Sequence, residues 1–156
     1  MRYFNKFLVV TLLCWACSAQ AAGADATAET ESTDPVIETV RAAIAKKDWV
    51  AAQATLKKAL EGNAKNADYH NLYAYSVRKS AQPNMDMVFR HYGEALRLDP
   101  KHRGAHEYIG EAYLMVNNLP KAKEHLAALD KLCFFGCEEY RDLKTAIAAY
   151  EASHPR

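Results

Sequence analysis

Small and large residues recur along this chain in a unit of about 34 positions. When Arg103 is taken as the first position, Ile109 and Gly110 fall at positions seven and eight, and Ala122 and Leu126 fall at twenty and twenty-four. Small residues at such positions let two helices approach closely, and large residues between them fill the remaining space. One helical hairpin cannot bury its apolar face alone, whereas about three stacked hairpins can. The repeat therefore predicts an array of stacked helical hairpins.

The pattern is helical throughout the part of the chain that begins at Asp34. Apolar and small residues recur there at intervals of three and four, the period of an amphipathic helix, and no strand alternation is convincing. Helix breakers divide this part into helices of about 12 to 15 residues. The breakers are Gly62-Asn63, Gln82-Pro83-Asn84, Asp99-Pro100, Asn117-Asn118 and Gly136. We therefore expect an all-α fold, a helical-hairpin repeat solenoid of about three units.

The last predicted helix, 138–152, has the pattern of a capping helix. One of its faces is apolar and the opposite face carries Glu139, Arg141 and Lys144. A terminal repeat has an apolar edge that must be covered, and a helix with one apolar face can cover it. The apolar face is formed by Tyr140, Leu143, Ile147 and Tyr150.

On these positions the chain resembles the tetratricopeptide-repeat (TPR) family, and within it the exported bacterial members. The resemblance covers about residues 33–152 and is clearest in "HRGAHEYIGEAYLMVNNLPKAKEHLAALDKLCFFGCEEYRDLKTAI". It implies a domain over 34–152, with repeats at about 33–66, 67–102 and 103–136 and a capping helix at 138–152. One position departs from the family pattern, because Phe134 replaces the usual proline at position thirty-two of the last repeat.

The first 21 residues have the three parts of a secretory signal peptide. Arg2 and Lys6 give a positive start, residues 7–17 are apolar, and Ala19-Gln20-Ala21 is a small-x-small cleavage signal. The apolar run is short for a bilayer span, so a single-pass anchor is the alternative only if cleavage fails. Residues 22–33 are small and acidic, which predicts a flexible linker. We therefore expect an exported, periplasmic protein with no membrane span in the mature chain.

Two cysteines, Cys133 and Cys137, remain after the signal peptide, and in an exported chain such a pair most often forms a disulfide. Gly136 between them can take a left-handed backbone conformation, which would fold Cys137 back towards Cys133. The bond would pin the capping helix to the last repeat. Reduced redox-active thiols and a metal site are the alternatives. A redox dithiol usually has two intervening residues and a βαβ context, and zinc would need about two more ligands.

The resemblance also implies a binding surface, because the family binds peptides on the concave face formed by its first helices. The residues placed on that face are Asn71, Tyr75, Arg78, Glu107 and Glu111. Asn71, Tyr75 and Arg78 could hydrogen-bond an extended peptide. The alternative is that these side chains only solvate the face or touch the N-terminal linker.

The family's carboxylate clamp is absent from this face. The clamp uses Lys and Asn in the first repeat and basic residues in the third, and the corresponding positions here hold Ile37, Arg41, Gly104 and Tyr108. The resemblance therefore does not extend to binding of chaperone tails.

Nothing in the sequence supports an enzyme. A Ser-His-Asp arrangement, a glycine-rich phosphate loop and an HExxH motif are all missing. His102 and His106 are four residues apart and could share a metal, but we interpret them as packed or half-exposed histidines. The formal charge of +1 and the lack of a basic run argue against a nucleic-acid surface.

We expect a non-catalytic periplasmic adaptor that binds a protein or peptide partner without a cofactor or metal. Self-association of the repeat is a further possibility. The alternative function is a metal- or redox-handling envelope protein that uses Cys133 and Cys137.

Overall fold

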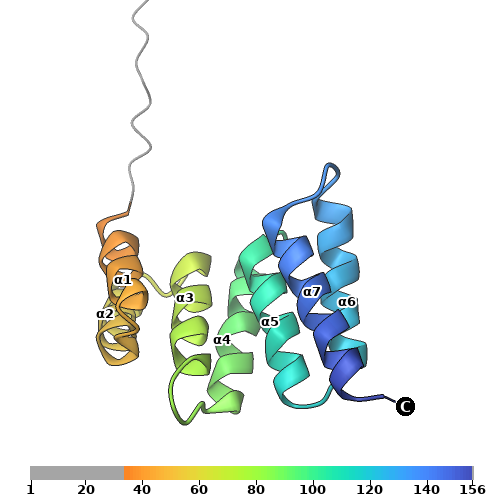
Figure 1. The fold of residues 1–156 in the computed structure, drawn as a ribbon. Coiled ribbons are helices and arrows are strands. Elements are labelled where there is room, and N and C mark those ends of the chain that lie inside the picture. The colour runs from red at the N-terminus through yellow and green to blue at the C-terminus, as the bar shows by residue number, and fades with distance from the viewer. Residues whose placement is uncertain (1–33, 156) are drawn as a thin grey trace, which may run out of the picture. The chain divides into compact units, whose positions relative to one another are not determined.

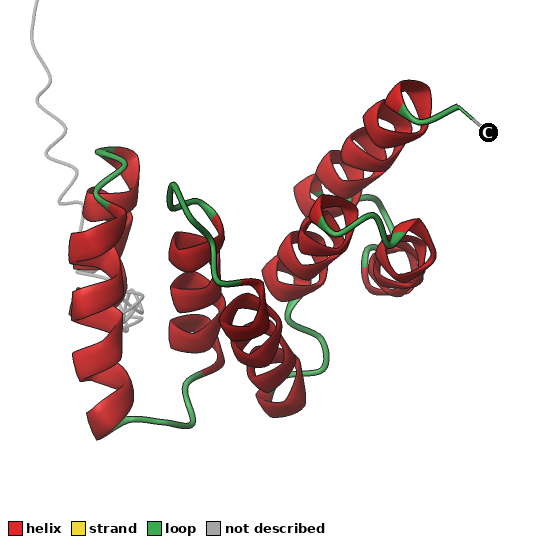
Figure 2. Cartoon of the chain, turned by 90° about the horizontal axis from the view of Figure 1, so that it is seen from below, coloured by secondary structure: helices red, strands yellow, loops and turns green. Residues whose placement is uncertain are grey.

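The computed structural model describes residues 34–155, and the predicted signal peptide (1–21) and linker (22–33) lie outside the described residues. Within 34–155 the chain forms seven helices and no strand (Figure 1; Figure 2). The prediction of an all-α fold is confirmed. The helices are α1 (Pro35–Ala45), α2 (Trp49–Gly62), α3 (Ala67–Arg78), α4 (Met85–Leu98), α5 (Arg103–Met115), α6 (Leu119–Leu132) and α7 (Glu138–Ser153).

The helices pack as hairpins in chain order. α1 packs on α2, α3 on α4 and α5 on α6, and each hairpin packs on the helix that follows it (Figure 1). The first helices of successive hairpins also touch, since α1 contacts α3, α3 contacts α5 and α5 contacts α7. These contacts place α1, α3, α5 and α7 along one face, which we call the first-helix face. The predicted array of helical hairpins is therefore confirmed.

The turns inside the first and third hairpins are built in the same way. Lys47 and Asn117 both have a φ of 58°, in the left-handed region. The next residue donates its backbone N–H back into the helix, from Asp48 to the Ala43 oxygen at 2.9 Å and from Asn118 to the Tyr113 oxygen at 2.8 Å. Asp48 and Asn118 then cap the following helix with their side chains. The two hairpins therefore repeat the same backbone conformation and hydrogen bonding in their turns.

The small residues of the repeat lie where the helices are closest. Ala52, Ala74, Ala95 and Ala122 are completely buried. Gly110 lies so close to α7 that a Cβ atom added to it would be 2.6 Å from Cδ2 of Leu143. Three apolar clusters result, one between each hairpin and the helix after it. The close-approach role predicted for these small positions is confirmed.

The last helix covers the end of the array as predicted. α7 ends at Ser153, one residue beyond the predicted boundary. Leu143 and Ile147 are buried against α5 and α6, and Tyr140 and Tyr150 are half-buried. None of the helices within residues 34–155 is long and apolar enough to span a membrane.

Candidate functional site

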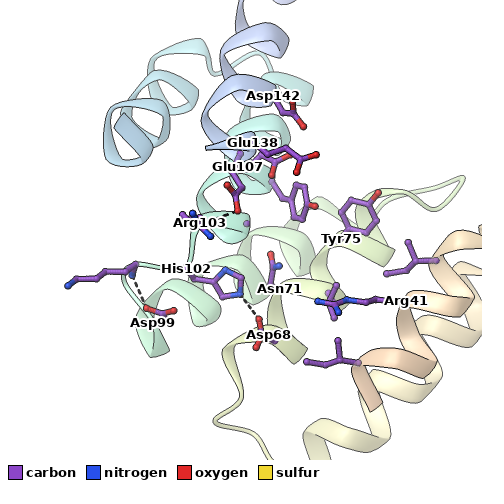
Figure 3. A pocket seen from close by; sticks show the side chains of 17 residues that line it. Arg41, Asp68, Asn71, Tyr75, Asp99, His102, Arg103, Glu107, Glu138 and Asp142 are labelled. Carbon is purple, nitrogen blue, oxygen red and sulfur yellow. Dashed lines mark hydrogen bonds and ion pairs between the residues drawn. The ribbon is translucent and has the colours of Figure 1, made fainter. Parts of the chain in front are cut away.

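A cavity of about 730 Å³ opens on the first-helix face (Figure 3). Its apolar end is formed on α1 and α3 by Ile37, Ile44, Leu72 and Tyr75. Its acidic end is formed on α5 and α7 by Glu107, Glu138, Glu139 and Asp142. The rest of the lining is formed by Arg41, Asp68, Asn71, Asp99, Lys101, His102, Arg103, Gly104 and Tyr108. The cavity therefore combines an apolar surface with a separate cluster of carboxylates.

The charges around the cavity do not balance. Six lining side chains are acidic and three are basic. Two acids pair with basic side chains, since Asp68 Oδ1 is 3.1 Å from His102 Nε2 and Glu139 Oε1 is 3.6 Å from Arg103 Nε. Within residues 34–155, no ion pair involves Glu107, Glu138 or Asp142. The excess negative charge is therefore concentrated at the acidic end.

Glu107 is the most buried of these acids. Its residue surface is 7% exposed, and its carboxyl has no hydrogen-bond or ion-pair partner among the described residues. Burial raises the pKa of Glu107 to about 8, and the nearby charges of Glu111, Asp142 and Glu139 act in the same direction, while Arg78 opposes them. With this pKa the carboxyl is largely protonated at neutral pH.

Asn71 is a second buried polar side chain without a partner. It is 5% exposed, and its Oδ1 has no hydrogen-bond partner in the described part of the chain. Its Nδ2 lies beside Gly104, where an added Cβ atom would be 3.4 Å away. An unpaired buried amide oxygen costs about 1 to 3 kcal/mol.

Tyr75 and Tyr108, which line the cavity, belong to an aromatic wall that also includes Trp49. The rings of Tyr75 and Tyr108 are 4.8 Å apart, and the ring of Trp49 meets Tyr75 edge-on at 6.2 Å. The guanidinium carbon of Arg78 lies 5.6 Å from both tyrosine rings. Such contacts hold aromatic rings in place and add cation–π attraction.

Arg78 contacts this aromatic wall but does not itself line the cavity. It is 6% exposed, and its Nε donates to the Tyr92 hydroxyl at 3.3 Å. Its Nη2 is 2.6 Å from Glu111 Oε2, which is an ion pair although the orientation is not that of a hydrogen bond. Arg78 and Glu111 therefore satisfy each other instead of lining the cavity.

The structure thus divides the predicted concave residues into two groups. Asn71, Tyr75 and Glu107 line the cavity, as expected for the binding face (Figure 3). Arg78 and Glu111 lie outside its lining, and the burial of Arg78 argues against the hydrogen bond to a peptide that the sequence suggested. Glu138 and Asp142 also line the cavity, although the sequence did not predict them as site residues. The sequence feature that could have identified them is the acidic first turn of the capping helix, which packs on α5.

His102 and His106 do not come together as a metal pair. His102 caps α5 by accepting from the Ala105 N–H, and its Nε2 reaches Asp68. His106 instead lies with its Nδ1 3.0 Å from Nδ1 of His125. The second hairpin repeats this arrangement, with Nδ1 of His70 2.9 Å from Nδ1 of His91. Burial and then the partner imidazole lower the pKa of His91 and of His125 to about 4.

Cys133 and Cys137 lie at disulfide distance, with their Cα atoms 5.5 Å apart. Gly136 has a φ of 80°, which confirms the left-handed conformation expected there. Cys137 is the N-cap residue of α7, and Glu138 and Glu139 occupy the first turn. Phe134 and Phe135, inside the loop, are 89% and 96% exposed. The bond would tie the start of the capping helix to the end of α6.

We expect reduction of this bond to destabilise the protein only modestly. The loop that it closes is short, so the free energy of unfolding should fall by about 2 kcal/mol. Urea denaturation of the oxidised protein and of the Cys133→Ser/Cys137→Ser variant measures the difference. In the oxidised protein both thiols should resist alkylation until a reductant is added. Equal stability of the two forms, or two thiols that react without reductant, would contradict this prediction.

No family model matches this sequence, and no curated protein matches it. The geometry of the cavity is therefore the basis for the functional proposal.

Proposed function

We propose that this protein is a non-catalytic adaptor that binds an extended segment of a partner protein in the cavity of the first-helix face. The observation that carries this proposal is the presence at one cavity of two buried polar residues: Asn71, whose buried Oδ1 has no hydrogen-bond partner, and Glu107, which forms no ion pair within residues 34–155. Folding leaves such groups unpaired at a cost, which a bound partner can remove.

The size and composition of the cavity favour a peptide over a small compact ligand. The cavity extends across α1, α3, α5 and α7, with apolar groups at one end and acidic groups at the other. An extended segment can place one side chain at each end while its backbone passes Asn71. The resemblance to TPR proteins supports the same use of this face, and we propose that the chain is a member of that family.

We propose that binding takes place outside the cytoplasm. The support comes from the signal-peptide pattern of residues 1–21 and from the pair Cys133 and Cys137 at disulfide distance. Disulfides persist in oxidising compartments such as the periplasm. The partner would then be another envelope protein or an exported peptide.

A random peptide library displayed on phage tests the adaptor function without assuming a partner. Peptides selected on the oxidised protein should lose at least about tenfold in affinity on Tyr75→Ala, which removes part of the aromatic wall. Gly104→Leu should have a similar effect, because Gly104 lines the cavity and a larger side chain would fill it.

Phe134→Ala is the control, since this exposed aromatic residue lies outside the cavity lining. Circular dichroism verifies that each variant remains helical. Selected peptides that are insensitive to Tyr75→Ala and Gly104→Leu, but sensitive to Phe134→Ala, would contradict binding in the cavity.

A second candidate function rests on the cysteine segment. Single ligand atoms of Cys133, Cys137 and Glu139 lie within 4.8 Å of one another, so the reduced thiols and this carboxylate could surround a metal ion. Stoichiometric zinc bound to the reduced protein, with no peptide binding, would favour this metal- or redox-handling role over the adaptor.

A further inference from the structure

We propose that the acidic end of the cavity binds the side chain of a lysine or arginine in the partner segment, with Glu107 as its main ion-pair partner. This inference rests on the proposed peptide-binding function and specifies the chemistry of the peptide. Three features of the site support it.

The first feature is the arrangement of charge. Glu107, Glu138 and Asp142 converge at the acidic end from two helices (Figure 3). Two basic side chains close to this end are already engaged, because Arg78 pairs with Glu111 and Arg103 pairs with Glu139. A cationic side chain entering here would meet a buried carboxylate and two more exposed ones. A charged pair of this kind is stronger where contact with water is reduced, and Glu107 is the most buried carboxylate at this end.

The second feature is the neighbouring amide of Asn71. Asn71 and Glu107 occupy equivalent positions on α3 and α5, so they present side chains to the same face. An Asn amide can donate to a peptide carbonyl and accept from a peptide N–H. A ligand with both a backbone carbonyl and a cationic side chain could therefore accept from the Asn71 amide N–H and pair with the Glu107 carboxylate. A simple inorganic cation could be bound by oxygen atoms but has no group to accept a hydrogen bond from the amide N–H.

The third feature is the composition of the chain's own N-terminal segment. Residues 22–33 contain Asp25, Glu29 and Glu31 and no basic residue. Their charges have the same sign as the acidic end, so this segment is a poor occupant of it. A basic segment of another protein fits by charge, and an apolar residue a few positions away would fit Ile37, Ile44 and Leu72.

Binding of a cation should be coupled to proton release. The carboxyl of Glu107 is largely protonated in the empty cavity, because its pKa lies at about 8. An ammonium or guanidinium group beside it favours the ionised carboxylate. The groups that face Glu107 are Glu111, Glu139 and Asp142, which oppose ionisation, and Arg78, which favours it. Affinity for a basic peptide should therefore increase as the pH rises from 6 to 8.

The test uses peptides with blocked ends that differ at one central position, Lys, Arg, Gln or Glu, in the context of the best peptide from the library selection. Fluorescence anisotropy with the oxidised protein gives each affinity. The Lys and Arg peptides should bind at least about tenfold more tightly than the Gln peptide. Glu107→Gln should remove this preference and leave the Gln peptide nearly unaffected. Calorimetry in two buffers of different ionisation enthalpy should show close to one proton released at pH 7.

Glu61→Gln is the matched control, because Glu61 lies at the exposed end of α2, outside the cavity lining. Spermidine is tested as a free polyamine and calcium as a free cation. The inference is overturned if the Lys and Gln peptides bind equally, or if Glu107→Gln weakens both to the same extent. It is also overturned if spermidine or calcium binds at Glu107 more tightly than any peptide does.

Peptide binding that depends on Tyr75 but not on the charge of the peptide's central residue would overturn this inference and leave the adaptor function standing. Absence of any peptide binding would overturn the proposed function itself.

Discussion

Gly110→Ala is expected to lower the free energy of unfolding by about 2 kcal/mol, even though alanine is the better helix former. The added methyl group would lie 2.6 Å from Cδ2 and 2.8 Å from Cδ1 of Leu143. Leu143 is completely buried among α5, α6 and α7, so its side chain cannot turn into solvent to make room. The two helices must separate or repack, and the capping helix loses contact with the last repeat. Urea denaturation followed by circular dichroism measures the effect.

The sign of this effect should reverse when the leucine is removed. Leu143→Ala alone should cost about 3 kcal/mol through lost burial and the cavity that it leaves. In that background Gly110→Ala has room for its methyl group and should stabilise the protein by up to about 1 kcal/mol. This double-mutant comparison separates the steric contact from helix propensity.

Gly93→Ala is the control for both experiments. Gly93 lies inside α4, and a Cβ atom added there meets nothing within 4 Å. This substitution should therefore stabilise the protein by up to about 1 kcal/mol. Destabilisation by Gly110→Ala that persists in the Leu143→Ala background would show that the close approach of α5 and α7 is not its cause.

The parts of the fold that follow from local sequence patterns were predictable. Helix period and breaker residues are local properties, so the helices after Asp34 could be located from them. The small residues Ala74 and Gly110 repeat at the spacing of the hairpins, so the helix approaches that they permit were predictable too. The left-handed Gly136 and the capping role of α7 followed from the same reasoning.

The candidate site was only partly predictable, because side-chain partners depend on tertiary packing. Helix position alone placed Asn71, Tyr75 and Glu107 on the face that carries the cavity. It could not show that the Arg78 guanidinium would turn between α3, α4 and α5 to reach Tyr92 and Glu111. A long flexible side chain can reach several surroundings from one backbone position.

The acidic end of the cavity was missed for a related reason. When α7 is considered alone, its sequence pattern indicates that Glu138 and Asp142 are solvent-exposed residues of a terminal helix. They become part of the site only because α7 packs beside α5, next to Glu107. The functional contribution of a capping helix therefore cannot be judged from its own amphipathic pattern.

Glu107→Gln is expected to make the protein progressively more stable than the wild type as the pH rises from 5 to 8. The pKa of Glu107 is raised from 4.5 to about 8 on folding, so between these values the unfolded chain releases a proton that the folded protein keeps. The stability associated with the protonated carboxyl is therefore fully present below pH 4.5 and is lost as the pH rises towards 8. Glutamine has the same shape and never ionises, so the variant does not suffer this loss.

The size of this gain should be about 2 to 3 kcal/mol between pH 5 and pH 8, smaller than the full shift implies because water in the open cavity screens the carboxylate. The measured quantity is the difference between the two unfolding free energies at each pH. This difference is required because His91 and His125, whose pKa values are lowered to about 4, reduce the stability of both proteins as the pH falls below about 6.5. Glu61→Gln removes the same charge from an exposed site and serves as the control. A difference between Glu107→Gln and the wild type that stays constant from pH 5 to 8 would mean that the carboxyl is ionised throughout, and that the empty cavity already satisfies it.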